Sequence, residues 1–170
     1  MKIHDQLRRP FPLHKIHWRV GSTNAKKLNC KPWEATKGIA LAYIDARDAM
    51  SRLDKVVGAE NWQCEYPLAD SGLLICRVGI RASVFGFDRN EWIWKSNGAG
   101  DTQVEAEKGK CSDAFKRAAV LWGVGQYLYA LPFSWVKLHN GKVIDPPALP
   151  EWALPDGFDR LLKKQESQSE

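Results

Sequence analysis

The chain has 170 residues, of which 44% are hydrophobic, and it carries a net charge of +5 with an isoelectric point of about 9.0. This length suits one domain, and no apolar run approaches the ~20 residues that a membrane helix needs. The first ten residues are polar and lack the apolar stretch of a signal peptide, so we expect neither a membrane protein nor a secreted one.

The basic residues are unevenly distributed along the chain. Residues 1–37 hold nine Lys and Arg against Asp5 and Glu34, whereas the rest of the chain is close to neutral. A basic segment of this kind favours a polyanionic partner. Five of its cations suit a diffuse attraction to phosphates rather than defined contacts: Arg8, Arg9, Lys15, Lys26 and Lys27.

The sequence predicts no cofactor and no metal site. The four cysteines lack a Cys-x-x-Cys spacing, and Cys64, Cys76 and Cys111 have apolar neighbours, which is typical of reduced core thiols in a cytosolic protein. The four histidines are not spaced as zinc ligands. The chain also contains no phosphate-binding loop and no local signature of a Ser-His-Asp triad, so ATP hydrolysis is not expected.

The first third of the chain predicts an arm, a hairpin and a helix. Residues 1–13 form a basic arm bounded by prolines. Alternation over residues 14–20 and an apolar run over residues 38–44 predict two paired strands joined by a long polar loop. Residues 45–58 carry apolar side chains at helical spacing, with an aspartate as the N-cap and a glycine as the stop.

An antiparallel meander of three strands follows. In the last of these strands, we expect Trp92 and Trp94 to face inward, and Glu91 and Lys95 to face solvent. The predicted strands cover residues 61–68, 72–86 and 91–100.

A long helix is predicted over residues 102–122, with Cys111 on its inner stripe. After it come a proline-rich surface strap over residues 131–157 and a polar tail without regular structure over residues 158–170. The sequence thus predicts a single α+β domain that ends near residue 157.

Two adjacent cations, Lys116 and Arg117, lie on the predicted long helix. Lys110 lies seven residues before Arg117 and therefore shares its face, and Asp113 is placed to pair with Arg117 at i, i+4. The spacing fits an edge that binds phosphates, but an ordinary solvated helix face explains it at least as well.

Arg19 and Tyr43 lie on the two strands of the predicted hairpin. A guanidinium beside an aromatic ring suits single-stranded nucleic acid, because the guanidinium can take a phosphate and the ring can stack on a base. A tyrosine buried in the core is an equal alternative for Tyr43.

Three segments resemble one family: LAYIDARDAMSRLDKVVGAENWQCEY, EAEKGKCSDAFKRAAVLWGVGQYLY and PPALPEWALP. Together they are similar to the phage-borne Sak branch of the Rad52/Rad22 superfamily of single-strand annealing proteins, from about residue 16 to residue 155. The resemblance implies a β-β-α-β-β-β-α core that assembles side by side into a ring or filament. It also implies ATP-independent binding of single-stranded DNA by its backbone, and annealing of a complementary strand in phage recombination and double-strand break repair.

The resemblance assigns roles to individual residues. Lys116 and Arg117 match the Lys-Arg pair on the floor of the family's DNA groove, and Arg19 and Tyr43 match an arginine and a tyrosine of its hairpin region. Ser112 stands one turn from a hydroxyl residue of the eukaryotic members. The eukaryotic pattern has a further arginine where this chain has Val120, and the long C-terminal region of those members is missing.

The resemblance also implies a cellular location and binding partners. It implies a non-enzymatic protein in the cytoplasm of a bacterial host, associated with the nucleoid, whose partners are single-stranded DNA, its complement and further copies of the same chain. A host or phage single-strand binding protein or recombinase stays open as a partner, since the sequence does not address it.

Two other functions stay open. One is a passive single-strand binder that protects a strand without pairing it. The other is a Mg²⁺-dependent recombination nuclease, for which Asp88, Glu91 and Lys95 would form the site. Surface charges that only contact solvent explain those three residues better.

Overall fold

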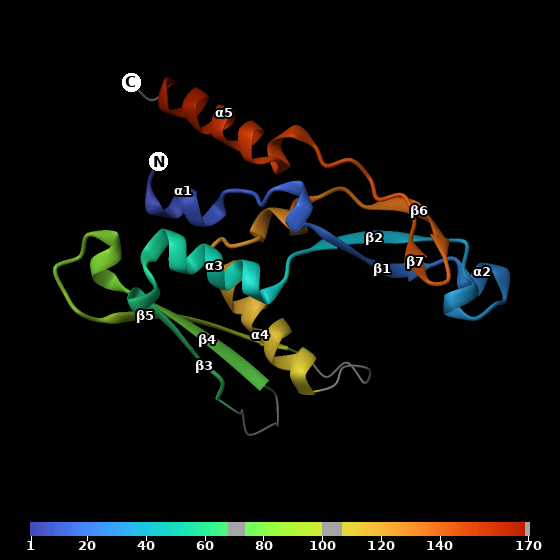
Figure 1. Ribbon diagram of the computed structural model, residues 1–170, viewed down its shortest axis with the longest axis horizontal. Helices are drawn as coiled ribbons and strands as arrows, with labels where there is room; N and C mark the ends of the chain where they lie inside the picture. The colour runs from blue at the N-terminus through green and yellow to red at the C-terminus, as the bar shows by residue number, and fades with distance from the viewer. Residues whose placement is uncertain (68–73, 100–106, 169–170) are drawn as a thin grey trace. The chain divides into compact units, whose positions relative to one another are not determined.

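A computed structural model describes residues 1–67, 74–99 and 107–168 (Figure 1). The chain divides into two compact units. Met1–Arg9 and Asp45–Gln126 form the first, which we call the helix–sheet unit. Pro10–Ile44 and Tyr127–Glu170 form the second, which we call the hairpin unit.

The order of elements confirms the predicted α+β class. From residue 17 to residue 121, apart from a short helix in the hairpin loop, a hairpin, a helix, three strands and a long helix follow one another in the β-β-α-β-β-β-α order. The complete order is α1 (Ile3–Arg8), β1 (His17–Thr23), α2 (Ala25–Leu28), β2 (Lys37–Tyr43), α3 (Ala46–Val57), β3 (Trp62–Glu65), β4 (Leu74–Arg81), β5 (Trp92–Ala99), α4 (Glu107–Leu121), β6 (Ser134–His139), β7 (Lys142–Val143) and α5 (Pro155–Glu166).

The core of the helix–sheet unit lies between α4 and an antiparallel sheet. The sheet has the order β3-β4-β5, and α4 packs against β4 and β5 (Figure 1). Because successive strand residues point to opposite faces, every second residue of the central strand is buried under the helix: Cys76, Val78 and Ile80. Trp122, just after α4, donates its indole N–H to the carbonyl of Val78 at 3.0 Å.

The other face of this sheet carries stacked arginines and tryptophans. Strand register places Trp94 opposite Gly79 and Trp92 opposite Arg81. The guanidinium of Arg77 lies 4.6 Å from the ring centre of Trp94, and that of Arg81 lies 4.5 Å from the ring centre of Trp92. A Cβ at position 79 would lie 2.9 Å from the Trp94 ring, so glycine is what lets this ring lie close to the strand.

The predicted phase of β5 is therefore wrong. Trp92 and Trp94 lie on the face opposite α4, whereas Lys95 lies on the helix side. The Lys95 ammonium donates to the carbonyl of Leu121 at 2.8 Å and lies 4.3 Å from the ring centre of Trp122. The free carbonyls at the end of α4 and an aromatic face hold a cation better than the solvent-facing position we predicted.

The predicted basic arm contains helix α1, which packs against α3. Leu7 of α1 is buried, as are Ala49 and Leu53 of α3. The Arg52 guanidinium donates to main-chain carbonyls of α1 and of Arg9, and so ties the end of α1 to α3.

Cysteine burial departs from the prediction at two positions. Cys76 is fully buried, as expected, but Cys64 is only half-buried and Cys111 is exposed. Cys111 lies in the second turn of α4, and from Gly109 onward the first buried residue of this helix is Ala114. Burial raises the pKa of the Cys76 thiol to about 12 and also raises the pKa of Cys64.

The hairpin unit is built on a sheet of order β1-β2-β6-β7. The predicted hairpin of β1 and β2 is confirmed, although β1 extends to Thr23 and the loop after it contains α2. The unit's small apolar core lies where the sheet meets this loop and includes Ala25, Ala35 and Leu138. Gly38 has no room for a side chain, because a Cβ there would lie 2.9 Å from both Val20 and Leu138.

The last segment is more regular than the sequence predicted. Residues of the expected surface strap form β6, which pairs antiparallel with β2. Residues 155–166, mostly within the expected polar tail, form α5, which starts at Pro155 and pairs Arg160 with Glu151. The turn expected at residues 69–72 and the start of the predicted long helix lie outside the described residues. Within the described ranges, no helix is both long and apolar enough to cross a membrane.

Candidate nucleic-acid interface

The cations of interest lie on the face of α4 that points away from the sheet. An α-helix turns by about 100° per residue, so the buried residues Ala114, Phe115 and Ala118 define the opposite face. Lys116 and Arg117 lie on this outward face, whereas Lys110 and Ser112 lie on its two opposite flanks, about 160° apart around the helix axis. These four are thus brought together on one helix of one unit.

Lys116 is paired within the helix. Its ammonium lies 3.2 Å from a carboxylate oxygen of Asp113, at i, i+3, and its side chain is 25% exposed. We predicted that Asp113 would pair with Arg117 instead. Both partners are reachable from one carboxylate on a helix surface, so spacing alone does not select between them.

Arg117 is the more available cation of the pair. Its side chain is exposed and, among the described residues, makes no ion pair, while its main-chain carbonyl lies 3.5 Å from the amide nitrogen of Asn97 on β5. Ser112 is exposed and Lys110 half-buried on the same helix. Within the part of the chain that the structure describes, the outward face therefore offers one guanidinium without an ion pair and one partly neutralised ammonium, with the Ser112 hydroxyl at its flank.

Arg19 and Tyr43 share one face of the β1–β2 hairpin. The register pairs Arg19 with Leu41 and His17 with Tyr43, so these four side chains point to the same side. Arg19 is exposed and Tyr43 half-buried. The ring centres of Tyr43 and His17 lie 5.4 Å apart with a tilt of 37°.

His17 is a candidate that sequence reasoning missed. The alternation in HKIHWRV already places His17 and Arg19 on the same face of a strand, which was a usable signal. The opposite hairpin face carries the apolar residues Val20 and Ala40, and Ala40 is buried. The face with Arg19 is therefore the one available to a ligand.

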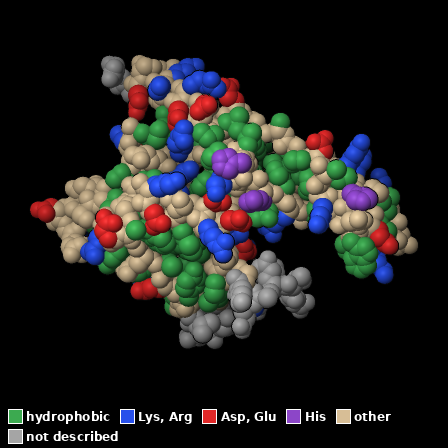
Figure 2. Space-filling model, viewed as in Figure 1, with side chains coloured by type: hydrophobic (Ala, Val, Ile, Leu, Met, Phe, Trp, Pro, Cys, Tyr) green, Lys and Arg blue, Asp and Glu red, His purple; other side chains and the backbone are tan. Residues whose placement is uncertain are grey.

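Further cations lie at the other end of the hairpin unit. Lys26 and Lys27 are exposed on α2, as expected for a diffuse attraction to phosphates. Figure 2 shows Lys and Arg side chains at this end of the unit. Such exposed cations contribute a salt-dependent attraction rather than sequence readout.

The structure does not assemble the alternative nuclease site. Lys95 turns toward the end of α4, and Glu91 lies 3.6 Å from the guanidinium of Arg89. Asp88 is an exposed residue of the same turn. These three side chains therefore do not form the cluster that a Mg²⁺ site requires.

A comparison with models of known protein families shows the family of the chain. The model of the Rad52/22 family double-strand break repair proteins matches residues 1–144. The chain belongs to the Rad52/22 family. The matched residues include both the β1–β2 hairpin and α4, which carry every predicted site residue.

Two curated relatives of this Rad52/22-family chain are both called single-stranded DNA-binding protein DdrA. One is from Deinococcus deserti, with 35% identity over 161 residues, covering 92% of this chain and 73% of the relative. The other is from Deinococcus radiodurans, also 35% identical over 161 residues, covering 92% and 71%. No solved structure matches the chain.

Proposed function

We propose that this Rad52/22-family chain binds single-stranded DNA through its sugar-phosphate backbone and anneals complementary strands, without hydrolysing a nucleotide. Its family membership and the name of its DdrA relatives support the binding of single strands. The structural observation that supports specific binding residues is the exposed Arg117 beside Lys116 on the outward face of α4.

Each unit contributes its own contact surface in this proposal. In the helix–sheet unit, Arg117 and Lys116 bind phosphates, with Lys110 and Ser112 beside them. In the hairpin unit, Arg19 binds phosphate, and the Tyr43 ring lies beside it. Phosphate contacts hold a strand without using its Watson–Crick edges, so the bases stay available to a complementary strand.

Self-assembly completes the proposal. Two or three phosphate contacts in one subunit bind weakly, but a ring or filament of copies presents many such contacts to one strand at high effective concentration. We propose that the annealing activity serves homologous recombination and double-strand break repair of a phage.

The decisive variant is Lys116→Ala with Arg117→Ala, measured by fluorescence anisotropy with a labelled oligothymidine. We expect at least tenfold weaker binding at low salt with the fold retained. The log–log salt slope should shrink by about 1.4, because each phosphate contact to a single strand contributes about 0.7. The matched control is Lys163→Ala with Lys164→Ala, which removes the same charge from exposed positions of α5.

A second measurement separates annealing from passive binding and from nuclease activity. Two complementary labelled oligonucleotides are mixed with the protein, and duplex formation is followed by energy transfer. Faster duplex formation with wild type, lost in the double variant, supports annealing. Slower duplex formation would indicate a protective binder, and shortened strands in the presence of Mg²⁺ would indicate a nuclease.

A further inference from the structure

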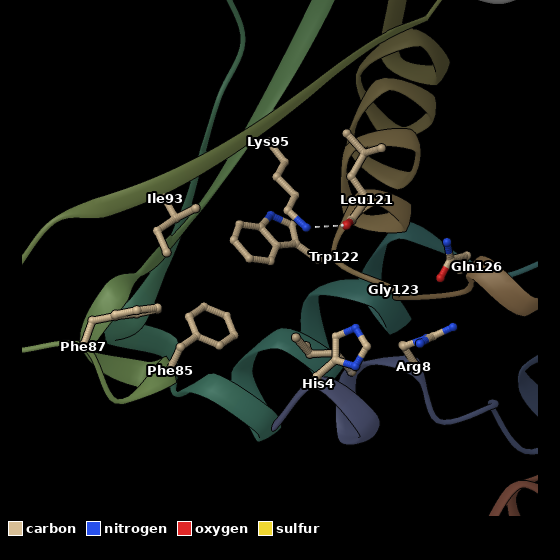
Figure 3. Close-up of a pocket in the computed structure, with 11 residues that line it drawn as sticks. His4, Arg8, Phe85, Phe87, Ile93, Lys95, Leu121, Trp122, Gly123 and Gln126 are labelled. Carbon is tan, nitrogen blue, oxygen red and sulfur yellow. Dashed lines mark hydrogen bonds between the residues drawn. The ribbon is translucent and has the colours of Figure 1, made fainter. Parts of the chain in front are cut away.

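An open hollow of about 570 Å³ lies within the helix–sheet unit at the end of α4 (Figure 3). Its walls come from α1, from the turn between β4 and β5, from β5 itself and from the residues that close α4. None of the residues predicted to make defined contacts with DNA lines it, although Arg8 is one of the five cations expected to attract phosphates diffusely. The hollow is therefore separate from the proposed phosphate-binding surface of α4.

The charged side chains that line this hollow are basic. Its ionisable lining residues are His4, Arg8 and Lys95, and no acidic side chain lines it within the described parts of the chain. Lys95 is held by the Leu121 carbonyl, and His4 lies 3.9 Å from Asp5 outside the hollow. Arg8 is exposed and forms no ion pair with any described residue, so it is the cation most available to a ligand.

Gly123 holds the Arg8 side chain at this wall. Its φ of +96° is a conformation that residues with a Cβ rarely adopt, and a Cβ at this position would collide with Cγ of Arg8. The arginine stem therefore packs on the bare main chain at the end of α4. This contact already restricts the rotamers of Arg8 before a ligand binds. Binding to Arg8 therefore costs less conformational entropy than binding to a freely rotating arginine.

The rest of the wall is apolar and partly exposed. Phe87 is 47% exposed and Leu121 is 42% exposed, so the hollow offers apolar surface to a ligand. Trp122 is only 6% exposed, because Phe85 stacks parallel to it at 5.8 Å and Lys95 lies over its ring. A nucleobase would find no free indole face here, whereas a bulky apolar side chain can pack beside Phe87 and Leu121.

We propose that this hollow binds an acidic peptide segment of a partner protein, with an apolar side chain beside Phe87 and Leu121 and a carboxylate paired with Arg8. Cationic and apolar groups side by side, without a competing acidic group, are complementary to a peptide that carries both carboxylates and a bulky side chain. This inference goes beyond the proposed DNA binding and does not depend on it.

The probe is the fluorescein-labelled peptide Ser-Asp-Glu-Asp-Glu-Leu-Phe with a free C-terminus, titrated with the full chain and followed by anisotropy. We expect binding in the micromolar range, and none with a peptide that has Lys in place of its acidic residues. Arg8→Gln and Phe87→Ser should each weaken binding at least fivefold. Arg47→Gln, at an exposed arginine of α3 outside the hollow, is the matched control.

Each outcome is decisive. Phe87 is half exposed, so Phe87→Ser keeps the test valid even if Arg8→Gln fails to fold. No binding of the acidic peptide, or equal binding by wild type and Phe87→Ser, overturns the proposal. A loss of oligothymidine affinity in Phe87→Ser without peptide binding would assign the hollow to nucleic acid instead. The Lys116→Ala, Arg117→Ala variant should bind the peptide normally, which separates this test from that of DNA binding.

Discussion

The carboxylate of Asp113 lies 3.2 Å from the ammonium of Lys116, one turn further along α4. This pair neutralises part of the cationic face that we propose for phosphate binding. Asp113→Asn should therefore tighten binding of single-stranded DNA, by about twofold to fivefold at low salt, because it frees Lys116 and removes a charge that repels phosphate. Anisotropy at 50 mM and 300 mM salt measures this gain.

The gain from Asp113→Asn should shrink at the higher salt, and the variant should lose about 0.2–0.5 kcal/mol of stability with the helix pair. Glu166→Gln, at an exposed end of α5, is the control for the change in net charge. Equal affinity of Asp113→Asn and wild type at low salt would mean that this face of α4 does not meet DNA.

The adjacent cations Lys116 and Arg117 should contribute unequally to DNA binding. Arg117 is exposed without an ion pair among the described residues, whereas Lys116 shares its charge with Asp113. Arg117→Ala should therefore weaken oligonucleotide binding more than Lys116→Ala does. In the Asp113→Asn background, the effect of Lys116→Ala should grow. A double-mutant cycle on binding constants measures this coupling, and additive effects would contradict it.

The ring of Tyr43 should matter more than its hydroxyl. If the ring stacks on a base or on a sugar, Tyr43→Phe should bind oligothymidine nearly as wild type, and Tyr43→Ala should lose about 1–3 kcal/mol of binding free energy. Because Tyr43 also contacts the His17 ring, thermal unfolding must accompany the binding assay. A loss of stability without loss of affinity would assign Tyr43 to packing.

Gly79→Ala should destabilise the helix–sheet unit without touching the proposed DNA surface. The added Cβ would lie 2.9 Å from the Trp94 ring on the central strand, so the ring or the strand must shift. Overpacking of this kind costs about 1–3 kcal/mol in the free energy of unfolding, which urea titration measures. Ser96→Ala, on the same sheet face, removes an atom instead and should change stability little.

Stability should fall at alkaline pH in a way that depends on Cys76. Burial raises the pKa of this thiol to about 12, so the folded state keeps a proton that an unfolded cysteine releases near pH 9. The contribution is constant below that pH, and the free energy of unfolding then decreases between about pH 9 and 12. Urea unfolding of Cys76→Ala should show a shallower decrease, whereas the exposed Cys111→Ala should behave as wild type.

The sequence predicted the elements whose periodicity is local. Amphipathic spacing was sufficient for α3 and for the outward face of α4, and local strand patterns were sufficient for the hairpin and the existence of the three-stranded meander. The predicted strand over residues 72–86 was too long, because β4 ends at Arg81 and Ala82–Phe85 form a 3-10 turn. The phase of β5 could not be predicted in the same way. The segment EWIWK alternates equally well in either orientation, and the end of α4 decides it by binding Lys95.

Local sequence patterns could not predict which distant segments pair in a sheet. Proline-rich flanks concealed β6, whose partner β2 lies about a hundred residues earlier in the chain. By contrast, α5 was detectable, because Phe158, Leu161 and Leu162 recur at helical spacing. In the site, spacing brought Lys116 and Arg117 to one face but did not show which of them Asp113 pairs with, since both lie within reach on a helix.

The chain passes from one compact unit to the other three times, after Arg9, after Ile44 and after Gln126. Neither unit is therefore a continuous stretch of gene. A deletion clone that ends at Ile44 or begins at Asp45 would lose elements of both units, and no single cut of the gene separates the two units intact. Truncation from either end of the gene can therefore spare at most one of the two units.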